Sequence, residues 1–161
     1  MWWHQSWLTI QGEFSDLGDA TDITRVCVRL LVAALLGAML GYERESAGAS
    51  AGLRTHMLVS MGSAMFVLIP LQAGMPLMDV SRVLQGVTAG VGFLGAGAIM
   101  KSHSDNQITG LTTAAGVWLT AAIGVAAGMG REGTAILCAM FAWVILALLK
   151  NKAKGARQDA P

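Results

Sequence analysis

Residues 83–100 read VLQGVTAGVGFLGAGAIM, a run that contains five glycines and no charged side chain. A helix that crosses a bilayer core of about 30 Å needs roughly 20 predominantly apolar residues, within a range of about 17 to 25. A chain in hydrocarbon must satisfy its own backbone N–H and C=O groups, and the run shows no strand-type alternation of polar and apolar residues. It therefore predicts a membrane-spanning helix.

Four more runs of similar length and composition occur along the chain. The five predicted spans are residues 26–42, 57–73, 83–100, 111–129 and 133–149. Hydrophobic residues make up 54% of the 161 residues and charged residues 13%, about half the charged share of soluble domains. The expected fold class is all-α, a polytopic membrane helix bundle with five transmembrane helices and lipid around it.

Basic residues predict the orientation of these spans. They concentrate in the gaps after the first and third spans and behind the last one, and such positive segments stay in the cytoplasm. We therefore expect a multi-pass membrane protein with an acidic, tryptophan-containing segment at 1–23 on the outer side, a transmembrane domain at 24–149 and a basic cytoplasmic tail at 150–161. A net charge of +1 argues against a nucleic-acid partner, because nucleic-acid binding needs many lysine and arginine side chains to neutralise the phosphates.

Glycines four residues apart let two membrane helices approach closely. The sequence therefore predicts that helix packing uses Gly37, Gly41, Gly86, Gly90, Gly92, Gly95, Gly97, Gly124 and Gly128. The third span holds five of them, so we expect it to be the central, most tightly packed helix, or else to line a dimer seam or a narrow pore. Residues 90–95 also match a dinucleotide-binding string, but the strand and acidic residue that such a site needs are missing. With no catalytic motif either, an enzyme is not expected.

Ionisable side chains at the ends of the spans are the candidate functional residues, because charges near membrane depth are costly. On the inner side, the predicted polar site consists of Glu43, Arg44, Arg54 and His56, with Glu43 and Arg54 as the preferred ion pair. The alternative is an ordinary interfacial loop whose long side chains reach toward water.

A second polar pair is predicted on the outer side, where Asp79 and Arg82 are three residues apart on one helical face. The sequence leaves open whether the protein binds a metal ion. Carboxylates suit Mg²⁺, and Glu43, Glu45 and Asp105 are the candidate ligands.

Several blocks in order carry a family resemblance. GYERE at 41–45, AGLRTHMLV at 51–59, DVSR at 79–82, GVGFLGAGAIM at 90–100 and GLTTAA at 110–115 closely resemble the signature of the MgtC/SapB family of bacterial inner-membrane proteins. The resemblance covers residues 24–149 and implies a helical membrane domain associated with adaptation to low Mg²⁺. It also implies that the protein lies in the bacterial inner membrane, so that the segment at 1–23 is expected in the periplasm. Because the chain ends soon after the fifth span, we expect the SapB-like minimal form that lacks the soluble C-terminal domain of larger members.

Two functions agree with these observations. The first is an integral membrane protein, expected to be a homodimer, that acts in magnesium and ion homeostasis by binding or modulating other inner-membrane proteins. The alternative is a transporter or channel for Mg²⁺, or for an ion coupled to protons, whose pathway uses the inner and outer polar residues.

Overall fold

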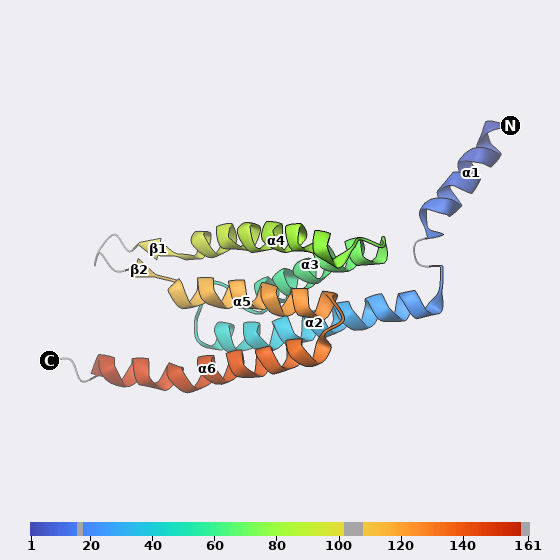
Figure 1. Cartoon of the computed structure of the whole chain (residues 1–161). Coiled ribbons are helices and arrows are strands. Elements are labelled where there is room, and N and C mark those ends of the chain that lie inside the picture. Colours follow the sequence, from blue (N-terminus) through green and yellow to red (C-terminus); the bar gives the residue numbers. More distant parts are fainter. Residues whose placement is uncertain (16–17, 102–107, 159–161) are drawn as a thin grey trace.

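The computed structural model describes residues 1–15, 18–101 and 108–158. In these residues the chain forms α1 (Trp2–Glu13), α2 (Ala20–Ser46), α3 (Leu53–Gln72), α4 (Leu77–Ala98), β1 (Met100–Lys101), β2 (Ile108–Thr109), α5 (Leu111–Gly128) and α6 (Glu132–Gln158). The two strands pair antiparallel, with Met100 opposite Thr109. Helices α2 to α6 lie side by side as one bundle, and α1 extends away from it (Figure 1).

Short turns connect the long helices, and glycines allow them. The backbone of Gly110 lies in the left-handed region at φ 88°, directly before α5. A β-carbon there would also collide with the carbonyl oxygen of Ala98. Glycine is therefore needed for both conformation and space at this turn. At the other end of the bundle, Asp19 precedes α2 as its N-cap residue, and its side chain accepts a hydrogen bond of 3.2 Å from the amide of Thr21, as N-cap residues do.

Length and composition identify four helices of the described chain as apolar enough to cross a membrane: α2, α3, α5 and residues 132–149 of α6. Helix α4 occupies the third predicted span and has 22 residues, but its first half contains Asp79, Arg82 and Gln85. The predicted all-α membrane bundle is confirmed. Because α4 is not among these four helices, the predicted number of five spans holds only if α4 also crosses the membrane.

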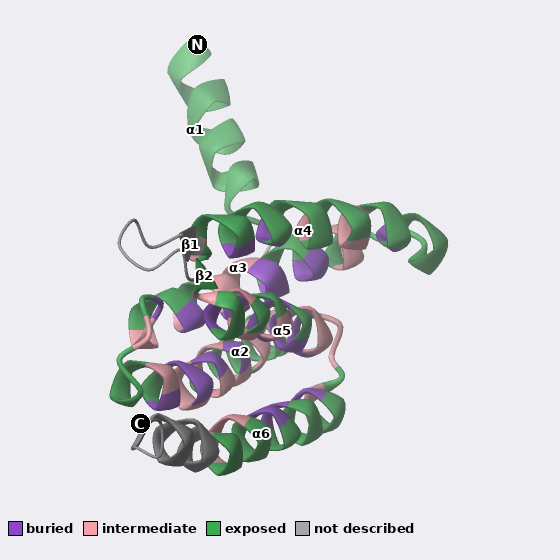
Figure 2. Cartoon of the chain, turned by 90° about the vertical axis from the view of Figure 1, so that its left-hand side faces the viewer, coloured by how far each residue is buried: buried purple, intermediate pink, exposed green. Residues whose placement is uncertain are grey.

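Helix α5 lies in the middle of the bundle and contacts α2, α3, α4 and α6. Helices α2 and α3 pack against α5 and against each other, while α4 and α6 lie at the edges of this group (Figures 1 and 2). The largest buried apolar cluster consists mainly of small side chains: Ala33, Leu40, Ala64, Ile123, Ala127, Ala135, Ala139 and Ala142. Alanine cores bring helix backbones close together, which is how membrane helices associate.

Large apolar side chains lie on the outside of the bundle instead. Leu35 is 59% exposed, Phe66 63% and Phe93 81%. In Figure 2 the outer surfaces of α4 and α6 are largely exposed, whereas buried residues gather on α3 and α5. An apolar exterior around a core of small residues suits lipid as the surrounding solvent.

Helix α4 lies at the edge of this arrangement, so the expectation that it is the central helix is wrong for a single chain. Its buried residues are Val80, Val91 and Gly95. Of its glycines, Gly95 lies in ordinary contact with Ala114 of α5, while Gly86, Gly90, Gly92 and Gly97 have open space where a β-carbon would be. The spacing of glycines permits a close approach between helices but does not determine which helix packs against them. That α4 lines a dimer seam stays a prediction.

Candidate functional site

A row of residues on α3 forms the centre of the candidate site. Gly52 precedes the helix, and His56, Ser60 and Ala64 follow at intervals of four residues. Residues four apart lie on one face of a helix. His56, Ser60 and Ala64 are completely buried, so this face of α3 is enclosed by its neighbours even though two of its members are polar.

Glycines of α2 lie against the first half of the row. A β-carbon at Gly37 would lie 2.6 Å from the carbonyl oxygen of His56, and one at Gly41 would lie 2.7 Å from Cα of Leu53. Real β-carbons do not come so close to backbone atoms, so only glycine fits at both positions. The backbones of α2 and α3 therefore meet directly beside His56.

Glycines of α5 enclose the other side of the row. Gly124 lies against the carbonyl of Ser60, and Gly128 against the carbonyl of Ala64, both closer than a β-carbon allows. The predicted packing roles of Gly37, Gly41, Gly124 and Gly128 thus agree with the structure. What the sequence did not indicate is that all four contact the same helix.

His56 is the largest polar side chain in the row. Its Nδ1 lies 2.9 Å from the carbonyl oxygen of Gly52. A carbonyl only accepts hydrogen bonds, so Nδ1 carries the proton, and in the neutral ring Nε2 is then an acceptor. Nε2 is directed toward α5, where a β-carbon at Gly116 would lie 3.5 Å from it.

Glu43 and Arg44 bring charge to the inner end of the same site. Glu43 is 6% exposed, and its Oε2 lies 3.5 Å from Nη1 of Arg44. A β-carbon at Gly41, two residues before Glu43, would lie 3.0 Å from Cβ of His56. The structure thus brings together Glu43, Arg44 and His56, three of the four residues of the predicted inner site.

The fourth residue, Arg54, lies elsewhere, and the preferred Glu43–Arg54 pair is not formed. Arg54 is exposed, and no ion pair within the described chain includes it. The reason is helical geometry, because residues two apart on a helix point about 200° away from each other. With His56 directed into the bundle, Arg54 must be directed out of it.

Glu45 has a structural role. The N-cap residue of α3, Gly52, has no side chain to cap the helix, and Oε2 of Glu45 accepts a hydrogen bond of 2.8 Å from the amide of Leu53. This carboxylate also complements the positive end of the helix dipole.

The described residues do not fit a Mg²⁺ site built from several ligands. Among them there is no group of three or more His, Cys, Asp or Glu close enough to hold a metal ion. Of the three candidate ligands, Glu43 lies beside Arg44, Glu45 caps α3, and Asp105 falls outside the described residues.

On the outer side, the structure replaces the predicted pair with a different one. Asp79 and Arg82 are exposed and line an open groove next to residues 73–76, but their side chains are not among the ion pairs of the described chain. Arg29 takes the structural role instead. Its Nη1 donates a 3.0 Å hydrogen bond to the carbonyl of Gly128, the last residue of α5, and its Nε lies 4.0 Å from Oε1 of Glu132 in α6.

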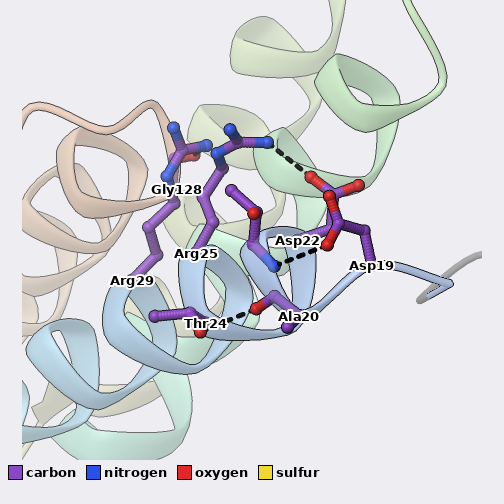
Figure 3. A network of polar contacts seen from close by, with 8 residues as sticks. Asp19, Ala20, Asp22, Thr24, Arg25, Arg29 and Gly128 are labelled. Atoms are coloured by element: carbon purple, nitrogen blue, oxygen red, sulfur yellow. Dashed lines mark hydrogen bonds and ion pairs between the residues drawn. The ribbon is translucent and has the colours of Figure 1, made fainter.

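Figure 3 shows Arg29 next to Gly128, with Arg25 paired to Asp22 one turn away. Arg29 lies within the first predicted span, residues 26–42, but is not among the residues predicted for either polar site. An arginine inside an apolar run is the signal that points to it, because such a charge needs a partner.

Comparison with known proteins agrees with this architecture. The model of the MgtC family matches residues 30–154. The chain is 43% identical over 134 residues to the protein SrpB of Synechococcus elongatus, an alignment that covers 76% of this chain and 74% of SrpB.

Two further relatives are longer than this chain. Identity is 40% over 126 residues to the putative magnesium transporter YhiD of Escherichia coli, covering 74% of this chain and 58% of YhiD. It is 37% over 131 residues to the protein MgtC of Salmonella typhimurium, covering 81% of this chain and 55% of MgtC. No solved structure matches significantly. The chain is thus a membrane protein that belongs to the MgtC family.

Proposed function

We propose that this protein acts in magnesium and ion homeostasis in the bacterial inner membrane by binding and modulating other membrane proteins, without catalysing a reaction. Among its relatives, YhiD is named a putative magnesium transporter, which connects the family with this ion. The observation that favours modulation over transport is the direct backbone contact of α3 with α2 and α5.

These contacts fill the interior of the bundle. Gly37 and Gly41 bring α2 against the backbone of α3, Gly124 and Gly128 bring α5 against it, and α2 and α5 also contact each other. Further along α3, fully or almost fully buried apolar side chains, Val67 and Leu68 of α3 and Ile123 of α5, occupy the space between the helices. Mg²⁺ gives up its water shell reluctantly, and a hydrated ion is too large for such a seam.

An interaction surface is present on α4. Gln85, Ala89, Gly92 and Ala96 are exposed and follow one another at intervals of three or four residues, so they form one stripe along the helix. Small residues together with one amide that can hydrogen-bond across helices are typical of interfaces between membrane helices. We assign this stripe to a second copy of the chain, which gives a homodimer paired through α4.

The transport alternative is tested by reconstituting the purified protein in liposomes that contain a Mg²⁺-sensitive or pH-sensitive dye. We expect wild-type vesicles to show the same influx as protein-free vesicles, because each chain is closed along α3. Mg²⁺ or proton influx that rises with the amount of protein would exclude the proposal and favour the transporter.

The dimer is tested by cysteine cross-linking in membranes. In a background with Cys27→Ala and Cys138→Ala, we expect Gly92→Cys to form a disulfide-linked dimer under mild oxidation. Leu35→Cys is the matched control, because Leu35 is also exposed but lies on α2. Equal cross-linking at both positions, or none at Gly92→Cys, would show that α4 is not the seam.

A further inference from the structure

The buried polar atoms that have no hydrogen-bond partner among the described residues include Nε2 of His56, Oγ of Ser60 and Oγ1 of Thr120. All three residues are completely inaccessible to solvent. Buried polar groups in proteins almost always have a partner, either protein or ordered water. Three such atoms at zero exposure therefore call for a ligand that hydrogen-bonds to them.

The packing places these atoms at one contact between α3 and α5. His56 and Ser60 are four residues apart on the buried face of α3. On α5, Gly116 faces Nε2 of His56 and Gly124 faces the carbonyl of Ser60. Thr120 lies midway between these two glycines, four residues from each, and so on the same face of α5. Thr120 is therefore level with the stretch of α3 between His56 and Ser60.

The side of the histidine ring that faces α5 is not covered by a side chain of residue 116. Gly116 has none, and a β-carbon there would have Nε2 of His56, at 3.5 Å, as its only neighbour among the described residues within 4 Å outside its own helix backbone. Successive turns of α3 are about 5.4 Å apart, close to the span that one molecule bridges with two hydrogen bonds of about 2.8 Å each.

The chemistry of the three atoms selects the ligand. Nε2 of the neutral ring accepts a hydrogen bond, and each hydroxyl both donates and accepts. Helix α5 contributes no ionisable side chain, and the charges of the site, Glu43 and Arg44, come from α2 and pair with each other. A cation would have only neutral ligands here, whereas water donates to Nε2 and bonds to both hydroxyls.

We propose that His56, Ser60 and Thr120 form a buried water-binding site between α3 and α5, in which bound water donates to Nε2 of His56 and bridges to the two hydroxyls. Ordered water is a regular part of buried polar sites where two to four polar partners surround it. The site adds a hydrogen-bonded link between α3 and α5 to the direct contact at Gly124.

Thr120→Val tests the proposal through the sign of its effect. Valine has nearly the shape of threonine, so the change removes only the hydroxyl. If water bonds to Oγ1, the variant loses a hydrogen bond and its melting temperature in detergent micelles falls. If Oγ1 has no partner, the change removes an unsatisfied polar group and the melting temperature rises, which would contradict the proposal.

The matched control is Thr88→Val. Thr88 is exposed on α4, and its hydroxyl donates to the carbonyl of Leu84 in its own helix. We expect its melting temperature to stay close to that of the wild type. Gly116→Ala supplies a second variant, because its methyl group displaces the water next to Nε2. A fall is expected, whereas alanine filling an empty space in a helix would raise stability.

A direct measurement keeps the test valid if a variant fails to fold. The protein is labelled with ¹⁵N-histidine in a background with His4→Gln and His103→Gln, which leaves His56 as its one histidine and the site unchanged. The chemical shift of Nε2 reports whether this atom accepts a hydrogen bond. Magnetisation transfer from water reports whether the donor is water. We expect a hydrogen-bonded shift and transfer from water. A free-acceptor shift without such transfer would overturn the proposal.

Discussion

Gly124 of α5 lies against the backbone carbonyl of Ser60 in α3, closer than any residue with a side chain allows. One turn earlier on the same face of α3, Gly37 of α2 lies against the carbonyl of His56. Helix α3 thus packs against the backbones of α2 and α5, which also contact each other, and this packing buries its polar side chains. The position of the candidate site follows from glycine packing, and each glycine in it is expected to be sensitive to substitution.

Gly124→Ala should destabilise the bundle, whereas Gly62→Ala should not. An alanine at 124 forces its methyl group into the backbone of α3, and overpacking of this kind costs about 1–3 kcal/mol. Gly62 lies on α3 with nothing within 4 Å of the position of a β-carbon, so alanine there gains up to about 1 kcal/mol of helix propensity. Unfolding in mixed micelles of increasing SDS content, followed by circular dichroism, measures both. Equal effects in the two variants would contradict the close contact.

Glu45→Ala should loosen the start of α3. The side chain of Glu45 accepts the hydrogen bond from the amide of Leu53, and loss of a helix cap costs about 1 kcal/mol. Glu45→Gln keeps an acceptor oxygen and should lose less. We expect faster hydrogen exchange at residues 53–56 in the alanine variant, with Glu13→Ala, an exposed change in α1, as control. Unchanged exchange at 53–56 would show that the cap contributes nothing.

Much of the fold could be predicted from the sequence because hydrophobic runs report helices directly. The span predicted at 111–129 appears as α5 (Leu111–Gly128), and the one at 57–73 lies almost wholly within α3 (Leu53–Gln72). The structure extends α3 by one turn toward its N-terminus, because Glu45 caps it from outside the run. A contact between residues eight apart in a turn leaves no trace in hydropathy.

The site was predicted in part, and the reason is geometric. Glu43, Arg44 and His56 could be found because ionisable residues near membrane depth are conspicuous. Ser60 and Thr120 could not, since hydroxyl residues commonly bond to their own helix carbonyls. Arg54 was predicted as the partner of Glu43 because the two residues carry opposite charges at nearby positions in the sequence. The prediction is wrong because Arg54 points away from the bundle when His56 points into it. Which glycines touch which helix is a property of the assembled bundle, so α4 was wrongly expected at its centre.

Arg29→Gln should destabilise the outer end of the bundle more than Arg25→Gln. The guanidinium of Arg29 is 18% exposed and binds the carbonyl of Gly128, and hydrogen bonds to charged groups contribute about 1.5–3 kcal/mol. Arg25 is 48% exposed and pairs with Asp22 in its own helix, a surface pair worth about 0–1 kcal/mol. Thermal melts of both variants in the same detergent measure the difference.

If Arg25→Gln costs as much as Arg29→Gln, the link between α2 and α5 is not what stabilises this end. Glu132→Gln distinguishes the contribution of the ion pair with Glu132 to stability from that of the hydrogen bond to Gly128. Its carboxylate lies 4.0 Å from the guanidinium and is 34% exposed, so we expect a smaller loss than for Arg29→Gln. A larger loss would make the ion pair, and not the carbonyl contact, the main interaction.

The orientation of the bundle can be tested at the two ends of α3. Ser50 lies in the turn before this helix and Met75 in the turn after it, and both are exposed. Since α3 is long and apolar enough to cross the membrane, the two positions should lie on opposite sides. Basic residues around the first turn predict that Ser50 lies in the cytoplasm. In a background with Cys27→Ala and Cys138→Ala, a membrane-impermeant maleimide should label Met75→Cys in intact cells and Ser50→Cys only after lysis. The reverse pattern would invert the bundle, and labelling of both from outside would show that α3 does not cross.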